Sequence, residues 1–238
     1  MFWQSRNRVK IISKNIDYQL IMCIKVRNFK EISIKINMKI GTKSVLFGAH
    51  CFFIHPWFVA YSWWKLYGFP FDPRLWVAFF VHDLGYIGKP NMDGDEGEMH
   101  PFYGAFVMGA LFGRKWFEFS LYHSRFLAKK LGGQPSKLCI ADKLAIAVTP
   151  AWLYLPMVNW TGEIHEYIKL SAKRETQGEG GVQNNKYESM QLMANTQKEW
   201  YSNLQKYILS WVDEHKDGKI DTWTPSQKKA VNESGVWQ

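Results

Sequence analysis

Histidine and aspartate side chains recur between residues 55 and 142, one or two to each predicted helix. The set comprises His55, His82, Asp83, His100, His123 and Asp142. Imidazole nitrogens and carboxylate oxygens are groups that a divalent metal binds together. Helices packed around a shared core can bring such groups to one point. The pattern therefore predicts a metal centre on which all six side chains converge.

The adjacent pair His82-Asp83 is the most informative part of this set. It ends an almost wholly apolar segment, residues 76–81. An ionisable pair at the end of a buried helix needs a partner, because an unpaired charge is costly to bury. Asp142, within the mostly apolar segment 138–148, is interpreted in the same way.

Glycine and proline divide residues 44–173 into predicted helices. Asp72-Pro73 indicates a helix start, because aspartate caps free N–H groups and proline fits the first turn. The expected helices run over 74–84, from His100 to about Gly113, over 116–131, and from Pro135 to Thr149. We predict an all-α fold, an HD-domain-like helical bundle without an extended sheet in this span.

The two ends of the chain differ from this body. Residues 1–37 are basic, include a short candidate strand over 31–36, and are interpreted as a dispensable extension because Met38 offers a second start. Residues 38–173 form the expected catalytic domain. The span 174–238 is predicted to pack on it as a linker (174–185), an amphipathic helix (187–215) and a polar tail.

Charge and cysteine usage restrict the function classes. The net charge of +9 first suggests a nucleic-acid or membrane partner, but residues 1–40 hold +7 of it. The nearly neutral body gives no strong case for nucleic acid. Three scattered cysteines are typical of a reducing cytoplasm. Residues 44–64 and 144–162 are uncharged, but histidine and proline within them make a membrane span the less favoured interpretation.

The residue order and its local strings resemble the HD superfamily of metal-dependent phosphohydrolases, in the version with two extra histidines. His82-Asp83-Leu84-Gly85 is similar to that family's H-D-[IL]-G signature. His100-Pro101-Phe102-Tyr103-Gly104 resembles the H-P-x-x-G of its HD-GYP branch, and Cys139-Ile140-Ala141-Asp142 resembles the string with the last ligand. The resemblance covers roughly residues 55–149.

The resemblance implies a role for each residue. His55, His82, Asp83 and Asp142 match the core ligands, while His100 and His123 match the pair that adds a second metal, with Asp83 as the bridge. One or two ions, of Mn, Fe, Mg or Zn, would activate a water for attack on a phosphoester, possibly of a nucleotide. Tyr86 stands at the family's lysine position, and the G-Y-P string is absent, which argues against cyclic dinucleotides.

Three cations near the predicted ligands are candidates for substrate chemistry. Asp83, Lys89 and Arg125 are the expected catalytic residues, and Lys89, Arg125 and Lys143 are expected to bind phosphate oxygens. The loop 93–98 is interpreted as solvated, despite its acids. His50 is expected to be a core or supporting histidine, and His165 and His215 are expected at the surface.

Two other functions remain open at this point. Some HD-fold proteins are di-iron oxygenases, and four histidines with two aspartates suit iron as well as manganese. Alternatively, the chain is a non-enzymatic membrane-associated or partner-binding helical protein. The many Trp and Tyr residues over 57–76 are expected to lie in the core, with a stacking platform for a base as the second interpretation.

Overall fold

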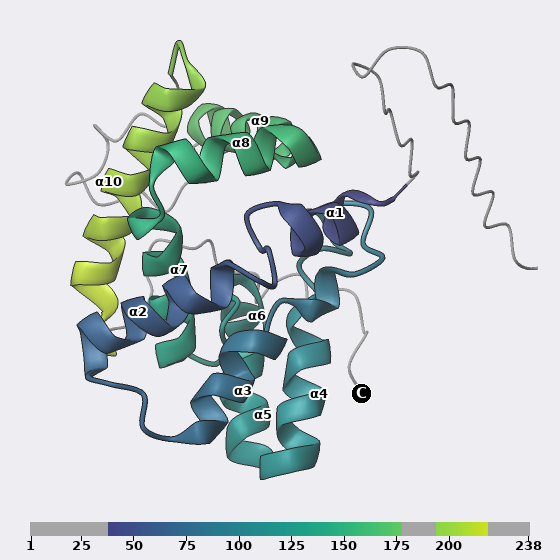
Figure 1. The fold of residues 1–238 in the computed structure, drawn as a ribbon, viewed down its shortest axis with the longest axis vertical. Coiled ribbons are helices and arrows are strands. Elements are labelled where there is room, and N and C mark those ends of the chain that lie inside the picture. The colour runs from purple at the N-terminus through teal and green to yellow at the C-terminus, as the bar shows by residue number, and fades with distance from the viewer. Residues whose placement is uncertain (1–37, 178–193, 219–238) are drawn as a thin grey trace, which may run out of the picture. The chain divides into compact units, whose positions relative to one another are not determined.

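A computed structural model of the chain describes residues 38–177 and 194–218, which belong to the unit Met38–Gln238. Every regular element in those residues is helical, which confirms the predicted all-α fold (Figure 1). The α-helices are α1 (Ile40–Phe47), α2 (His55–Tyr67), α3 (Pro73–Val81), α4 (Pro101–Phe112), α5 (Arg114–Leu121), α6 (Arg125–Lys130), α7 (Lys137–Val148), α8 (Ala151–Thr161), α9 (Glu163–Gln177) and α10 (Gln197–His215). A 3₁₀ helix, η2, spans Leu84–Tyr86.

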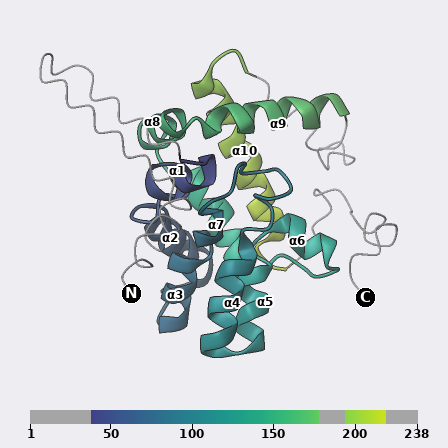
Figure 2. The same cartoon turned by 90° about the vertical axis from the view of Figure 1, so that its right-hand side faces the viewer.

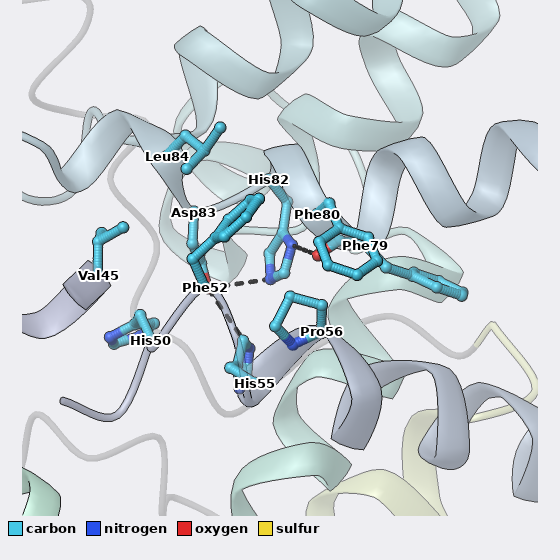
Figure 3. Close-up of a pocket in the computed structure, with 10 residues that line it drawn as sticks. All are labelled: Val45, His50, Phe52, His55, Pro56, Phe79, Phe80, His82, Asp83 and Leu84. Carbon is cyan, nitrogen blue, oxygen red and sulfur yellow. Dashed lines mark hydrogen bonds and ion pairs between the residues drawn. The ribbon is translucent and has the colours of Figure 1, made fainter. Parts of the chain in front are cut away.

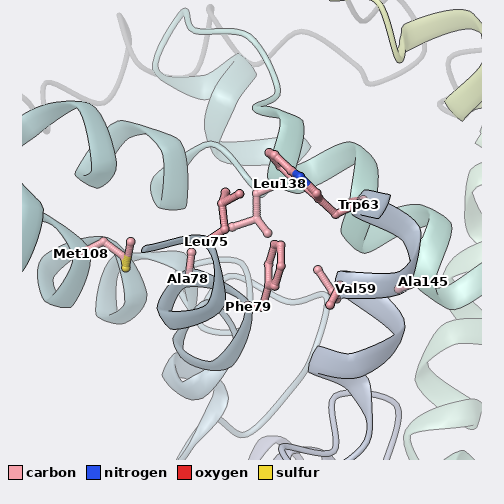
Figure 4. Packing of buried hydrophobic residues seen from close by; sticks show 10 residues of the cluster. Val59, Trp63, Leu75, Ala78, Phe79, Met108, Leu138 and Ala145 are labelled. Carbon is pink, nitrogen blue, oxygen red and sulfur yellow. The ribbon is translucent and has the colours of Figure 1, made fainter. Parts of the chain in front are cut away.

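Helix α7 lies at the centre of this arrangement and is buried on two sides. Leu138 on one side packs with Val59 and Trp63 of α2 and Phe79 of α3 (Figure 4). Its other side packs against α10, where Trp211 is fully buried. Figure 2 shows α7 enclosed in the same way from the side. Most residues on α7 are therefore buried, and Asp142 among them is 5 % exposed.

Short polar residues start several helices at the positions that the sequence indicates. The carboxylate of Asp72 accepts from the backbone N–H of Arg74 at the start of α3. Ser136 caps α7 in the same manner, by accepting from Cys139 N–H. Each cap satisfies a backbone donor that has no partner within the helix.

The predicted single helix over 116–131 is wrong, because the chain breaks between α5 and α6. Ser124 has an extended backbone, and its hydroxyl accepts from Leu127 N–H, so it starts a new helix. His123 lies in this break, with its backbone N–H bonded to Ser120 O. The local cap therefore competes successfully with continuation of the helix.

Two predicted boundaries near the C-terminal end are also wrong. Residues 174–177 belong to α9 rather than to a linker, and α10 starts at Gln197 rather than at residue 187. Thr196 fixes that start, because its hydroxyl accepts from Glu199 N–H. The other calls on the ends, namely the extension 1–37, the remaining linker and the polar tail, lie outside the described residues.

Among the described helices, none is by itself both long and apolar enough to cross a bilayer. The pair α7 and α8 meets the length and composition criteria together, but the two helices meet at a bend of 100°.

Candidate metal centre

Two groups of buried side chains that could hold metal ions meet in the interior. The first comprises His55, His82, Asp83 and Asp142, and the second comprises Asp83, His100 and His123. Within each group, one ligand atom of every residue lies within 4.8 Å of the others. All six predicted ligand residues are therefore brought together, and Asp83 belongs to both groups.

In the first group, the distances are close to those expected around a shared ion. His55 Nε2 lies 2.9 Å from Asp142 Oδ1 and 3.4 Å from Asp83 Oδ2. His82 Nε2 lies 3.0 Å from Asp83 Oδ2 (Figure 3). The same nitrogen lies 3.7 Å from Asp142 Oδ1. Two ligand atoms that are each about 2.1 Å from one metal, at roughly 90–110°, lie about 3.0–3.4 Å apart.

The second group uses the other oxygen of the same carboxylate. Asp83 Oδ1 lies 3.6 Å from His100 Nε2 and 3.5 Å from His123 Nε2. These two nitrogens are 3.0 Å apart. Because Oδ2 faces one group and Oδ1 faces the other, Asp83 has the geometry of a carboxylate that bridges two ions.

The ring orientations of three histidines are set by backbone carbonyls. His82, His100 and His123 place Nδ1 at 2.9, 2.7 and 2.6 Å from the carbonyl oxygens of Phe79, Gly97 and Ser120. A carbonyl only accepts, so each Nδ1 donates and each Nε2 is directed to the centre, where it carries a lone pair whenever its ring is neutral. This second contact is characteristic of metal-bound histidines.

The lone pairs of His100 and His123 face each other at 3.0 Å. Two acceptors at this separation repel unless a cation lies between or beside them. Burial, followed by the neighbouring His123, holds the pKa of His100 well below its usual range, so this ring is neutral. The pair therefore fits a metal ion better than it fits a hydrogen bond.

Buried atoms without a hydrogen-bond partner mark the first group. His82 Nε2 and Asp83 Oδ2 are 3.0 Å apart, yet their relative orientation is not that of a hydrogen bond. Leaving such atoms unsatisfied is costly. Burial opposes ionisation of Asp83, but the charge of His82 holds the pKa of Asp83 well below its usual range. The anionic Oδ2 of Asp83 and Nε2 of His82 thus lie side by side without a hydrogen bond, as expected for two ligands of one divalent ion.

Close approach of α3 and α4 explains how adjacent residues both reach the centre. His82 ends α3, and Asp83 leads into η2. A side chain at Gly85 would collide with the backbone carbonyl of His100. A side chain at Gly104 would lie 2.8 Å from Val81 O. Glycine at both positions therefore lets the two helix ends approach closely enough to share the centre.

The three predicted cations lie in different settings. Lys143 Nζ is 3.7 Å from Asp142 Oδ2, at the edge of the centre. The Arg125 guanidinium stacks 4.7 Å from the Trp211 ring and contacts the Tyr207 hydroxyl. Lys89 is half-buried, and its backbone carbonyl accepts from Gly41 N–H. Their catalytic and phosphate-binding roles, and that of Asp83, stay predictions.

Two residues that sequence reasoning missed support the centre. Tyr86 stacks on the His100 ring, with centroids 3.8 Å apart. Glu163 is fully buried and accepts from Ser44 Oγ at 2.6 Å. Because the Ser44 hydroxyl donates to Glu163, it accepts a hydrogen bond from His50 Nδ1, 2.9 Å away. This bond fixes the orientation of the His50 ring, which lines the pocket beside Asp83. In the sequence, Glu163 cannot be distinguished from a solvated glutamate in a first helical turn.

The predictions for the remaining histidines have mixed outcomes. His50 is largely buried and bonded to Ser44, as expected for a core or supporting histidine. His165 is exposed, as predicted. His215 was expected at the surface and is instead 2 % exposed, with its ring stacked on Trp211. Helical spacing places it on the buried face of α10.

No family model, curated protein or solved structure matches the chain.

Replacing His123 with alanine is expected to remove one ion and leave the other. The first group keeps its four residues, whereas the second retains only Asp83 and His100. Metal content, measured on the purified protein by mass spectrometry, should fall from about two ions per chain to about one. His165→Ala, at an exposed position on α9, is the matched control. Loss of both ions together would contradict separate sites.

Proposed function

We propose that the protein is a metal-dependent phosphohydrolase of the HD type, acting on a small phosphorylated substrate such as a nucleotide. The observation that carries this proposal is the Asp83 carboxylate, with one oxygen toward each group. The resemblance of the sequences around His82 and His100 to those of the HD superfamily also supports a phosphohydrolase. Two bound divalent ions would supply a water of lowered pKa for in-line attack on phosphorus.

The residues of the chain supply the positioning around that chemistry. The three backbone-bonded imidazoles hold their Nε2 atoms toward the centre without rearrangement. Burial of all six side chains keeps solvent from competing with them. No side-chain nucleophile is required. We infer that Lys143 binds a phosphate oxygen, which is supported by its ammonium 3.7 Å from Asp142 Oδ2 and by a side chain that is about one-third exposed.

A second candidate function, a di-iron oxygenase, is favoured by the small pocket beside the centre. His50, His55, His82 and Asp83 share its lining with six largely apolar residues, Val45, Phe52, Pro56, Phe79, Phe80 and Leu84 (Figure 3). Its volume of about 10 Å³ accommodates roughly one water-sized molecule. A pocket of that size, with apolar side chains opposite the ligand-type residues, suits a diatomic gas.

Metal reconstitution followed by a substrate panel tests the proposal. The protein is stripped with chelator, reloaded separately with Mn, Fe, Mg or Zn, and assayed on nucleoside mono-, di- and triphosphates and simple phosphomonoesters. Metal-dependent release of phosphate is the expected result. Oxygen consumption together with a visible iron spectrum, without phosphate release under any metal, would favour the oxygenase instead.

A further inference from the structure

A row of exposed aromatic side chains follows the outer face of α2. We call this surface the aromatic stripe, and it comprises Phe53, Trp57, Tyr61, Trp64, Phe69 and Phe71. Its members are 70, 57, 43, 56, 50 and 85 % exposed, respectively. Trp57, Tyr61 and Trp64 are spaced as neighbours on one face of α2, whereas Phe53 precedes the helix and Phe69 and Phe71 follow it. The prediction that the Trp and Tyr residues over 57–76 lie in the core is therefore wrong for Trp57, Tyr61 and Trp64.

The opposite face of α2 explains why the stripe points outward. Val59, Ala60 and Trp63 are buried against α3 and α7, so one face of α2 packs in the core and the opposite face is exposed. Ring contacts join the last three members of the stripe, Trp64 with Phe69 at 6.2 Å and Phe69 with Phe71 at 4.8 Å. Scattered exposed apolar residues are ordinary, but a contiguous aromatic patch marks an interaction surface.

The charges around the stripe indicate what it contacts. Residues 38–71 contain Lys39, Lys43 and Lys65 and no aspartate or glutamate. Lys65 Nζ lies 5.5 Å from the Tyr61 ring, within the stripe. The first acid after this segment, Asp72, is paired with Arg74 at 2.7 Å. The stripe thus combines exposed aromatic rings with the ammonium group of Lys65, and residues 38–71 supply no acid to oppose it. This combination is complementary to the anionic headgroups of a phospholipid bilayer.

The polar atoms of the stripe are also suited to a headgroup layer. Within the described residues, the indole N–H groups of Trp57 and Trp64 donate to no protein acceptor. By contrast, Trp76 and Trp200 donate to Pro70 O and Ser171 Oγ. Tryptophan and tyrosine favour the membrane interface because an apolar ring carries one polar group that stays hydrated.

We propose that the aromatic stripe docks the protein on membranes that contain anionic phospholipid. Only the outer face of α2 enters the interfacial layer, because its inner face belongs to the protein core. Helix α2 also carries His55 in its first turn, so docking holds the metal centre close to the bilayer surface. This proposal is independent of the reaction at that centre.

Co-sedimentation of the full chain with vesicles tests the proposal. Wild-type protein is expected to bind vesicles of equimolar phosphatidylcholine and phosphatidylglycerol, and to bind more weakly as salt is added. The double substitution Tyr61→Ser with Trp64→Ser should weaken vesicle binding about tenfold or more. Among the described rings, that of Trp64 contacts only Phe69, so its removal leaves the core packing in place. Lys65→Glu should weaken it further at low salt. Tryptophan fluorescence should shift to shorter wavelength on binding.

The matched control is Phe106→Ser, on α4, where the side chain is 64 % exposed but lies outside the stripe. It should bind vesicles like wild type. Equal binding by the Tyr61/Trp64 variant and wild type would overturn the proposal, since basic residues elsewhere would then suffice. The proposal would also be overturned if wild-type protein failed to bind vesicles and formed a dimer that the Tyr61/Trp64 variant dissociates. The stripe would then bind a second copy of the chain. Thermal unfolding of each variant confirms that it is folded.

Discussion

Replacing Asp83 with alanine is expected to remove both ions and to lower turnover to about one thousandth of wild type or less, more than the loss of a single transition-state donor. Its two oxygens contact different ligand groups, 3.0 Å from His82 Nε2 and 3.5 Å from His123 Nε2. No other residue among the described ones belongs to both groups. Metal content and phosphate release, measured on the same preparation, check the prediction.

The stability cost of this substitution should be small in metal-free protein. Burial lowers the pKa of His82, but the charges of Asp83 and Asp142 outweigh that effect and raise it to about 10. When Asp83 is absent, His82 can become neutral and leave no unpaired buried charge. Asp95→Ala, in the exposed acidic loop, is the control and should keep both ions. A variant at Asp83 that retained two ions would exclude the bridging role.

Replacing Glu163 with alanine is expected to destabilise the fold by about 3–5 kcal/mol. Its fully buried carboxylate accepts from Ala49 N–H at 2.7 Å and from the Tyr167 hydroxyl at 2.9 Å. It also accepts from Ser44 at 2.6 Å and from Thr161 at 2.9 Å. Removing it leaves buried donors without an acceptor, in α1, in the following loop and in α9. Urea unfolding in the presence of chelator measures the loss without a contribution from metal.

Two further variants separate hydrogen bonding from charge at this position. Glu163→Gln keeps the shape but turns one acceptor into a donor, so an intermediate loss is expected. Glu118→Ala removes a surface ion pair with Arg114 and should cost about 1 kcal/mol or less. If Glu163→Ala lowered the free energy of unfolding no more than Glu118→Ala does, the four hydrogen bonds of the Glu163 carboxylate would not stabilise the fold as proposed.

Much of the fold and of the candidate centre is predictable because it depends on local features. Asp72 and Ser136 start helices through bonds to backbone groups two or three residues away. Charged or metal-binding residues amid apolar ones, such as Asp142 on α7, are conspicuous because burial without a partner is costly. The identity of the six ligand-type residues therefore followed from residue type and setting alone.

The tertiary structure decided how those residues are divided. Asp142 meets His55, 87 residues away, because α7 packs on α2. The assignment of each Asp83 oxygen to a different group depends on the close approach of α3 and α4 through Gly104. Such distances arise from packing between elements that are remote in the sequence.

Which aromatic and polar residues are buried was likewise decided by neighbours. Trp63 and Trp64 are adjacent and of one type, yet they are 9 % and 56 % exposed. Glu163 and His215 resemble surface residues in the sequence and are both buried. Residue type sets the energy of burial, but whether another helix covers that face depends on the whole chain, and for this reason the sequence alone did not reveal it.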